Sequence, residues 1–301
     1  MVDVVIIGAG PAGLSAAIQL ARSNRSVLLF DRGKQRASFA LNYHNYLGFP
    51  DGIAGKKLLE LGRDQAEKYG VKIIQAEATA VKKTQDGQFT VEAGNQAFTG
   101  RRVIFATGVS DNTPNVPDVF DFLGRSIFHC LDCDGYELIG KKVVVFGKGN
   151  AAADAALRVL TFSKQVFIAS NGEQLSIDEK YLAKLKSNGI DRIETPIKEL
   201  QGNKGQLSAL IFADNSEREV EFGLSTAGSK ANNKLALGLG VTTIPNGHIL
   251  VDKDMKTSIE HVYAIGDVIN SSEQVSLAVA EGVRAAIMVN KTLREDYQTV
   301  F

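Results

Sequence analysis

A glycine-rich turn between a buried strand and a helix occurs twice in this sequence, and no other feature constrains the fold as strongly. The first turn, residues 8–13, follows the apolar run 4–7 and precedes the helix-like stretch 14–21. Gly8 permits the tight bend, Gly10 lets a phosphate approach the backbone, and Gly13 lets helix and strand pack closely. This order predicts a Rossmann-like α/β fold that binds a dinucleotide.

An acidic residue follows the next strand at the spacing expected of such a site. The apolar run 26–30 ends in Asp31, about twenty residues after the glycines. A carboxylate there can accept hydrogen bonds from a ribose diol. The alternative, an α/β fold that binds no dinucleotide, is weaker because strand, turn, helix and acid occur together.

The same order recurs in the middle of the chain. Residues 141–146 are strand-like, and residues 147–152 form a second glycine turn that opens a helix running through Ala155, Ala156 and Leu157. Two further strands end in small-residue turns, at residues 103–108 and 262–267. Because parallel strands place ligand contacts at their carboxyl ends, these two turns can lie near one cofactor. The sequence thus predicts two dinucleotide folds.

Both cysteines of the chain lie in one short motif. Cys130 and Cys133 are followed at once by Asp134, and two thiols at this spacing can open and close a disulfide while the acid moves a proton. A zinc site would need two more strong ligands, and the four histidines show no paired spacing. A structural bridge across so short a loop would remove little chain entropy. We expect a redox-active dithiol and no metal, with capping of a turn as the other role open to Asp134.

Composition excludes several classes of partner. The 301 residues suffice for two domains, and 34 basic against 34 acidic residues give no field that favours nucleic acid. No apolar run reaches the roughly 18 residues of a membrane span. The N-terminus lacks the pattern of a secretory signal. We therefore expect a cytoplasmic protein without a membrane or nucleic-acid partner, where a cysteine pair is more often catalytic than structural.

Taken in order, these motifs resemble the low-molecular-weight thioredoxin reductase family of two-domain flavoproteins, and the resemblance covers nearly the whole chain. It implies a three-layer α/β architecture with a discontinuous FAD-binding domain, residues 1–113 and 229–301. A domain like those that bind NAD(P)H, residues 114–228, would be inserted and would carry the cysteines. The resemblance also implies a homodimer.

The resemblance further implies roles for individual residues. Cys133 would exchange electrons with FAD, Cys130 would form a mixed disulfide with a thioredoxin-like protein, and Asp134 would serve as general acid and base. The residues placed on FAD are Gly8, Gly10, Pro11, Ala12, Gly13, Asp31, Arg32, Gln35, Asn45, Ala106, Thr107, Gly108, Gly266, Asp267, Gln274 and Val275.

Two aromatic residues close the polar stretch that follows the helix-like run 283–293. Tyr297 or Phe301 is expected to stack on the isoalloxazine ring, within one chain or across a dimer. The alternative is an ordinary chain end without a ligand contact.

The second dinucleotide fold departs from the family pattern. An NADP site has arginines after the strand that corresponds to residues 164–168, and residues 169–173 contain none. Glu173 lies a few residues beyond the position where an NAD site has its acidic residue. Lys148, inside the second glycine turn, is the one cation that the sequence suggests near this site. This combination resembles the deeply rooted, ferredoxin-dependent branch of the family, which implies a carrier such as ferredoxin as donor. An NADPH-dependent reductase or a dithiol oxidase remains open, as does a flavin redox sensor, which Asp134 disfavours because sensing needs no proton relay.

Overall fold

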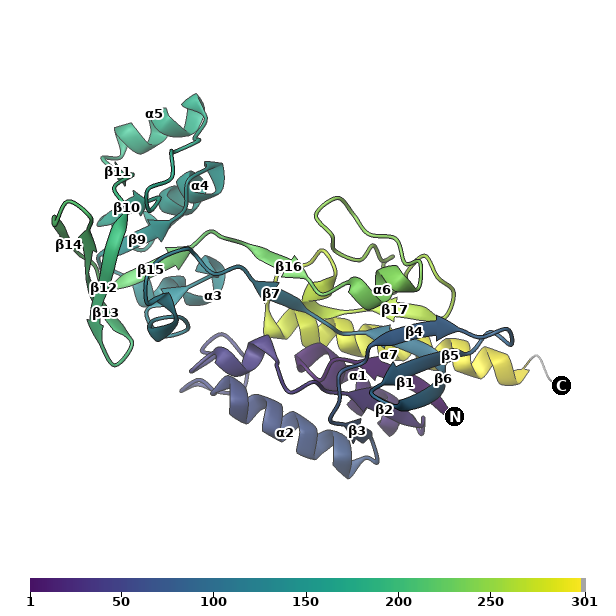
Figure 1. The fold of residues 1–301 in the computed structure, drawn as a ribbon. Helices are drawn as coiled ribbons and strands as arrows, with labels where there is room; N and C mark the ends of the chain where they lie inside the picture. Colours follow the sequence, from purple (N-terminus) through teal and green to yellow (C-terminus); the bar gives the residue numbers. More distant parts are fainter. Residues whose placement is uncertain (299–301) are drawn as a thin grey trace. The chain divides into compact units, whose positions relative to one another are not determined.

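The chain divides into two compact units in the computed structural model, which describes residues 1–298 apart from the last two side chains of that range. Unit 1 consists of Met1–Ser110 and Lys230–Phe301, and unit 2 consists of Asp111–Ser229 (Figure 1). The chain passes between them through β7 (Val109–Asp111) and β16 (Ser229–Ala231), which pair in a two-stranded sheet.

Unit 1 is built on a sheet whose parallel part has the strand order β3-β2-β1-β6, with β17 paired to β6. The predicted strand, turn and helix order is confirmed. The elements are β1 (Val2–Ile7), α1 (Pro11–Arg22), β2 (Val27–Phe30), η1 (Arg36–Phe39), α2 (Gly55–Lys68), β3 (Lys72–Ile74), α6 (Lys234–Gly238), β17 (Val262–Ala264), η4 (Gly266–Val268) and α7 (Val275–Gln298).

The central strand β1 has the burial that is typical of a parallel sheet. Val4, Val5 and Ile6 are fully buried, as expected of a strand covered on both faces. Helix α1 begins at Pro11 directly after Gly10, because proline is preformed for the first helical position and has no amide hydrogen to leave unpaired there. Its small residues bring it close to α7, where a Cβ at Gly282 would lie 2.4 Å from the Ala12 carbonyl oxygen.

An antiparallel extension completes this sheet. Strand β6 (Gln96–Phe105) is long enough to pair with β1 through one half and with β5 (Phe89–Ala93) through the other, and β4 (Ala80–Lys83) follows at the edge. Phe89 and Val91 are fully buried while Thr90 and Glu92 are half-buried. This alternation is typical of strands with one face on a core.

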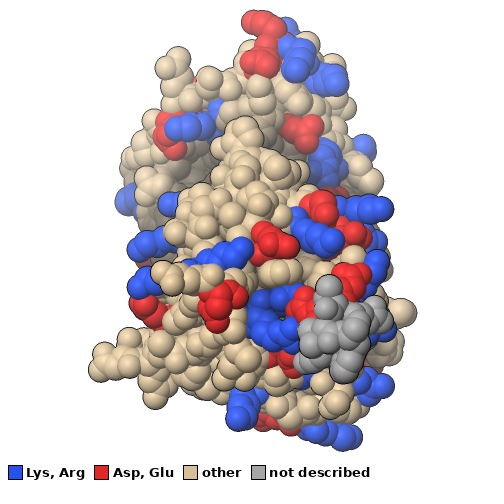
Figure 2. Space-filling view, turned by 90° about the vertical axis from the view of Figure 1, so that its right-hand side faces the viewer, with Lys and Arg blue, Asp and Glu red and all other residues tan. Residues whose placement is uncertain are grey.

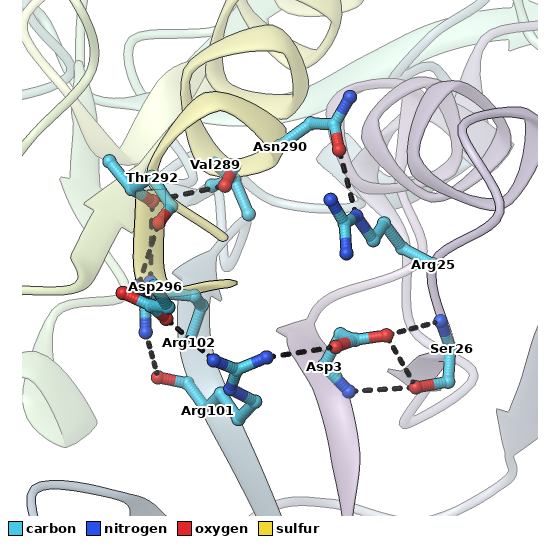
Figure 3. A network of polar contacts seen from close by, with 9 residues as sticks. All are labelled: Asp3, Arg25, Ser26, Arg101, Arg102, Val289, Asn290, Thr292 and Asp296. Carbon is cyan, nitrogen blue, oxygen red and sulfur yellow. Dashed lines mark hydrogen bonds and ion pairs between the residues drawn. The ribbon is translucent and has the colours of Figure 1, made fainter. Parts of the chain in front are cut away.

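Helix α7 is longer than the sequence indicates, since it continues past residue 293 to Gln298. Figure 3 shows the reason: Asp296 accepts hydrogen bonds from Arg101 and Arg102 of β6, at 2.7 Å each. The same network joins Arg101 to Asp3 of β1 and Arg25 to Asn290. It lies where β1 begins, so α7 runs from the carboxyl edge of the parallel strands to their amino edge.

Unit 2 repeats the doubly wound plan, with a parallel sheet in the order β11-β10-β9-β15-β8 and an antiparallel sheet in the order β12-β13-β14. The second predicted dinucleotide fold is confirmed. The elements are η2 (Val119–Asp121), β8 (Ile127–Phe128), α3 (Leu131–Asp134), η3 (Gly135–Leu138), β9 (Val143–Phe146), α4 (Asn150–Val159), β10 (Val166–Ala169), α5 (Glu179–Ser187), β11 (Asp191–Ile193), β12 (Ile197–Asn203), β13 (Gln206–Phe212), β14 (Glu217–Glu219) and β15 (Phe222–Ser225).

The surface charge and the helices bear on the classes of partner considered from the sequence. Basic and acidic side chains are interspersed with uncharged ones on the face shown in Figure 2, in keeping with the equal totals of the sequence. Within residues 1–298, no helix combines the length and the apolar character needed to cross a membrane.

Candidate functional site

The three glycines of the first turn lie in different surroundings. Gly8 has a φ of +114°, and a Cβ there would lie 2.2 Å from the Ala106 carbonyl oxygen. A Cβ at Gly13 would lie 1.9 Å from the Gly8 carbonyl oxygen. Gly10 has no atom within 4 Å of its Cβ position. The first and third glycines therefore permit close packing, while the second leaves open space at the start of α1.

That open space suits the pyrophosphate of a dinucleotide. Gly10 is the N-cap of α1, makes no side-chain cap, and has no acidic residue in the helical turn that follows. The first amide groups of a helix have no partners within the helix and carry partial positive charge, which favours an anion. Pro11 and Ala12 form the first helical turn beside this space. These features fit the phosphates of FAD.

Asp31 directly follows β2 and is 2% exposed. Its carboxylate accepts a hydrogen bond from the Gly33 amide at 2.8 Å and another from Gln35, and it forms an ion pair with Arg63 of α2. The structure thus brings together two predicted residues, Asp31 and Gln35. Arg63 was not predicted, because nothing in the sequence relates it to a position thirty-two residues earlier.

The two small-residue turns lie against the glycine turn, as the positions of their atoms show. The Ala106 amide donates to the Ile7 carbonyl at 2.9 Å, and a Cβ at Gly266 would lie 2.9 Å from that of Ala12. Beside Gly108, Thr107 is held by Asn232, which accepts from the Thr107 hydroxyl at 2.7 Å through its carbonyl and donates to the Thr107 carbonyl at 3.0 Å. All three turns therefore form one edge of the unit 1 sheet.

Asp267 lies in a charged cluster at this edge. Arg36 contacts Asp267 at 3.2 Å and Glu273 at 2.7 Å, and the Gly266 amide donates to Glu281 at 2.8 Å. Burial raises the pKa of the Asp267 carboxyl; the Arg36 guanidinium opposes the shift and the Glu273 carboxylate adds to it. Arg36 was missed in the sequence because a lone arginine at the start of a short 3-10 helix carries no pattern.

The other predicted FAD contacts lie after β2, before α2 and at the start of α7. Arg32 is exposed and pairs with Glu77 at 3.3 Å. Asn45 is exposed in the loop before α2, whereas Gln274 and Val275 stand at the start of α7, where the Ala278 amide donates to the Gln274 carbonyl. The Tyr297 side chain and Phe301 lie outside the described residues.

The cysteine motif forms a short helix in unit 2. Cys130 and Cys133 are joined by a disulfide, and Cys130 caps α3 by accepting a hydrogen bond from the Cys133 amide at 3.1 Å through its sulfur. Both cysteines and Asp134 are half-buried. A Cβ at Gly135 would lie 2.6 Å from the Phe162 ring, so a glycine lets the motif pack on that ring. The described residues hold no group of three or more His, Cys, Asp or Glu side chains placed for a metal.

The second glycine turn differs from the first in its side chains. A Cβ at Gly147 would lie 2.1 Å from the Thr226 hydroxyl oxygen, so packing again requires a glycine. The middle residue, Lys148, forms an ion pair with Glu173 beyond β10. Unit 2 thus has the fold of a nucleotide-binding domain but few cationic side chains that could bind a nucleotide phosphate.

Two dinucleotide folds, the first with space for the phosphates of FAD, and a disulfide in the second define a flavoprotein disulfide reductase. The sequence model of the pyridine nucleotide-disulphide oxidoreductases, an FAD-binding family, matches residues 2–282. The chain belongs to this family and, within it, to the low-molecular-weight thioredoxin reductases.

Individual relatives agree with this assignment. The chain is 34% identical to the thioredoxin reductase tcpT of Claviceps purpurea over 98% of its own length and 95% of that protein. It is 29% identical to NADPH-dependent thioredoxin reductase 3 of Arabidopsis thaliana over 97% of its length and 58% of that protein. A crystal structure of a putative thioredoxin reductase TrxB from Bacillus anthracis superimposes with a TM-score of 0.91 at 27% identity, covering 99% of this chain and 100% of that one.

Proposed function

We propose that this protein passes electrons from FAD, bound by unit 1, through the Cys130–Cys133 pair to thioredoxin or a similar protein disulfide, with a donor other than NADPH, such as ferredoxin. The disulfide at the start of α3, followed by a half-buried acid, carries the proposal. FAD would accept electrons singly or as a hydride and deliver two to a disulfide. The residues around the first glycine turn would hold it.

The thiol chemistry follows from the cap geometry. Two electrons and two protons convert the Cys130–Cys133 disulfide into two thiols. The Cys130 thiolate then attacks the partner disulfide, which forms a mixed disulfide and releases one partner thiolate. The Cys133 thiolate attacks the Cys130 sulfur, restores the disulfide and releases the second partner thiolate. The amide of Cys133, which points at the Cys130 sulfur, would favour the charged form of that thiol.

Asp134 is the proposed proton carrier in this exchange. It ends α3 one residue after Cys133, and its amide donates to the Cys130 carbonyl at 3.1 Å, which fixes its backbone beside the pair. Each half of the exchange leaves a thiolate that must gain a proton. A neighbouring carboxyl group can supply that proton and recover it later.

Trapping experiments separate the roles of the two cysteines. In Cys133→Ser the mixed disulfide between Cys130 and a thioredoxin cannot be resolved by Cys133. A covalent complex should therefore appear on a non-reducing gel when the thioredoxin carries a single cysteine, activated as a mixed disulfide with a small thiol, because that small thiol leaves and no partner thiolate remains to reverse the step. Cys130→Ser is the matched control and should give none. A stable complex through Cys133 alone would reverse the assignment.

The donor proposal is supported by residues 169–173, which follow β10 without an arginine, and by the engagement of Lys148 with Glu173. NADPH is the second candidate, favoured by the name of the Arabidopsis relative and by the intact glycine turn before α4. Anaerobic titration of the flavin with NADPH, NADH and reduced ferredoxin, followed by visible absorbance, tests both. We expect stoichiometric bleaching by ferredoxin alone. Rapid bleaching by NADPH would overturn the donor proposal.

The homodimer and the cytoplasmic location are proposals as well. The first is supported by the family resemblance and the second by the usual role of a cysteine pair in a reducing compartment. Sedimentation velocity of the purified flavoprotein tests the dimer, and a single species of about 32 kDa would exclude it.

A further inference from the structure

The second nucleotide fold carries an ion pair at the position where a nucleotide would be read. The Lys148 ammonium binds the Glu173 carboxylate. Lys148 follows β9 and Glu173 follows β10, the parallel neighbour of β9. The carboxyl ends of adjacent parallel strands are where the ribose and phosphates of a dinucleotide lie. The Lys148–Glu173 pair therefore lies across the carboxyl ends of β9 and β10.

The loop that carries Glu173 is anchored on both sides. The Ser170 hydroxyl donates to the Glu173 carbonyl, and the Glu173 amide donates back to the Ser170 carbonyl at 3.3 Å. The Gly172 amide donates to the Glu194 carbonyl at 2.7 Å, and the Asn171 side chain accepts from the Ile197 amide at 2.5 Å. The backbone of Glu173 is thus held beyond the end of β10.

Two further carboxylates are bonded to segments next to this turn in sequence or beyond β10. Asp178 accepts a hydrogen bond from the side chain of Asn150, the first residue of α4, at 2.8 Å, and its amide donates back at 2.9 Å. The Glu194 carboxylate accepts from the Leu175 amide at 3.0 Å. The first glycine turn offers a contrast, since the residue that corresponds to Lys148 there is Ala9, which is 1% exposed. Lys148 is thus paired with Glu173, while Asp178 and Glu194 are held by Asn150 and by the Leu175 amide.

We propose that Lys148 and Glu173 form a specificity-determining pair that disfavours nucleotides with a 2′-phosphate. Glu173 engages the one cation of the turn and places a negative charge where the 2′-phosphate of an NADP-type cofactor would lie. Repulsion between like charges then opposes binding, while the unpaired amides of α4 remain open to a pyrophosphate. The inference rests on the proposed donor and names residues that would enforce it.

Binding of adenine nucleotides to the holoprotein tests the pair directly. Isothermal titration with 2′,5′-ADP and 5′-AMP at low ionic strength should show that Glu173→Gln binds 2′,5′-ADP about tenfold more tightly than wild type. The gain for 5′-AMP should be smaller because it lacks the 2′-phosphate. High salt should reduce the difference between variant and wild type, since both side chains are about half exposed.

Two further variants complete the test. Glu219→Gln breaks a comparably exposed pair with Lys142 in the same unit and should leave both affinities unchanged. Adding Lys148→Ala to Glu173→Gln should reduce the gain, because the ammonium released in the single variant adds an attraction for the phosphate to the lost repulsion. Equal 2′,5′-ADP affinities of wild type and Glu173→Gln, or an equal gain in Glu219→Gln, would overturn the inference.

A failure of the specificity pair can be distinguished from a failure of the donor proposal. If NADPH bleaches the wild-type flavin while Glu173→Gln still gains affinity for 2′,5′-ADP, the donor proposal fails and the specificity pair stands. If ferredoxin alone bleaches the flavin and Glu173→Gln gains nothing, the donor proposal stands and the pair fails.

Discussion

At the first turn, Gly8 and Gly13 face backbone carbonyls, whereas Gly10 faces open space. Close packing therefore requires glycine at the first and third positions, whereas space for a ligand favours glycine at the second. The sequence pattern could predict that three glycines are needed, because their spacing follows from the fold. It could not identify Arg63 and Arg36, which reach Asp31 and Asp267 from loops and helices remote in sequence.

Alanine substitutions at Gly10 and Gly13 should separate ligand binding from folding. Gly13→Ala places a methyl group 1.9 Å from the Gly8 carbonyl oxygen and should lower the stability of the flavin-free protein by about 2 kcal/mol. Gly10→Ala should change that stability by less than about 0.5 kcal/mol and weaken FAD binding at least tenfold (about 1.4 kcal/mol). Thermal melting and FAD titration of both apoproteins measure this. Normal FAD affinity in Gly10→Ala would move the phosphate site elsewhere.

The Asp267 cluster predicts a pH dependence of stability. Burial raises the pKa of Asp267 above its ordinary value of 3.8, so the folded protein holds this proton to a higher pH than the unfolded chain. The group therefore stabilises the fold at low pH, and this contribution is lost as the pH rises through the folded pKa. Asp267→Asn removes the loss and leaves Arg36 paired with Glu273. Its melting temperature, relative to that of wild type, should rise from pH 4 to pH 7 in the flavin-free protein; a constant difference would contradict the shift.

At the level of elements, helix α7 shows what local sequence cannot reveal. The polar stretch after residue 293 lacks apolar periodicity, so its pattern did not predict helix. It is helical because Asp296 meets Arg101 and Arg102, about 195 positions away in the sequence. Arg102 is 3% exposed, and a guanidinium buried to this extent requires a partner. The tertiary contact thus decides the helix end.

Breaking this contact should be costly. Asp296→Asn leaves the buried Arg102 without its carboxylate and should lower the stability of the protein by about 2 kcal/mol, since one half of a buried pair remains uncompensated. Glu92→Gln breaks the exposed pair with Lys82 and should cost less than about 0.5 kcal/mol. Chemical denaturation of both variants with FAD present compares them. Equal stabilities would mean that the other acceptors of Arg102, the Thr292 hydroxyl and carbonyl and the Arg101 carbonyl, satisfy it without a carboxylate.

For the whole molecule, the same dinucleotide fold occurs twice, once with space for a phosphate at its glycine turn and once with an ion pair there. Both were predictable because a glycine turn between a strand and a helix is a local pattern with few alternatives. The acids of unit 2 were only partly predictable, since the contacts of Asp178 with Asn150 and of Glu194 with the Leu175 amide depend on how the loops pack. The structure therefore adds to the sequence mainly where charges from distant segments meet.

The course of α7 also limits how Tyr297 could meet a flavin. The helix starts at Val275, beside the proposed flavin site, and Asp296 is anchored at the opposite edge of the sheet, about 30 Å farther along the helix axis. Stacking of Tyr297 would therefore have to occur across a dimer. Tyr297→Ala, which keeps Asp296, should raise flavin fluorescence because the quenching ring is lost. Dilution below the dimer dissociation constant should raise wild-type fluorescence to the same level and leave the variant unchanged. Equal fluorescence of wild type and variant at concentrations where both are dimeric would exclude the contact.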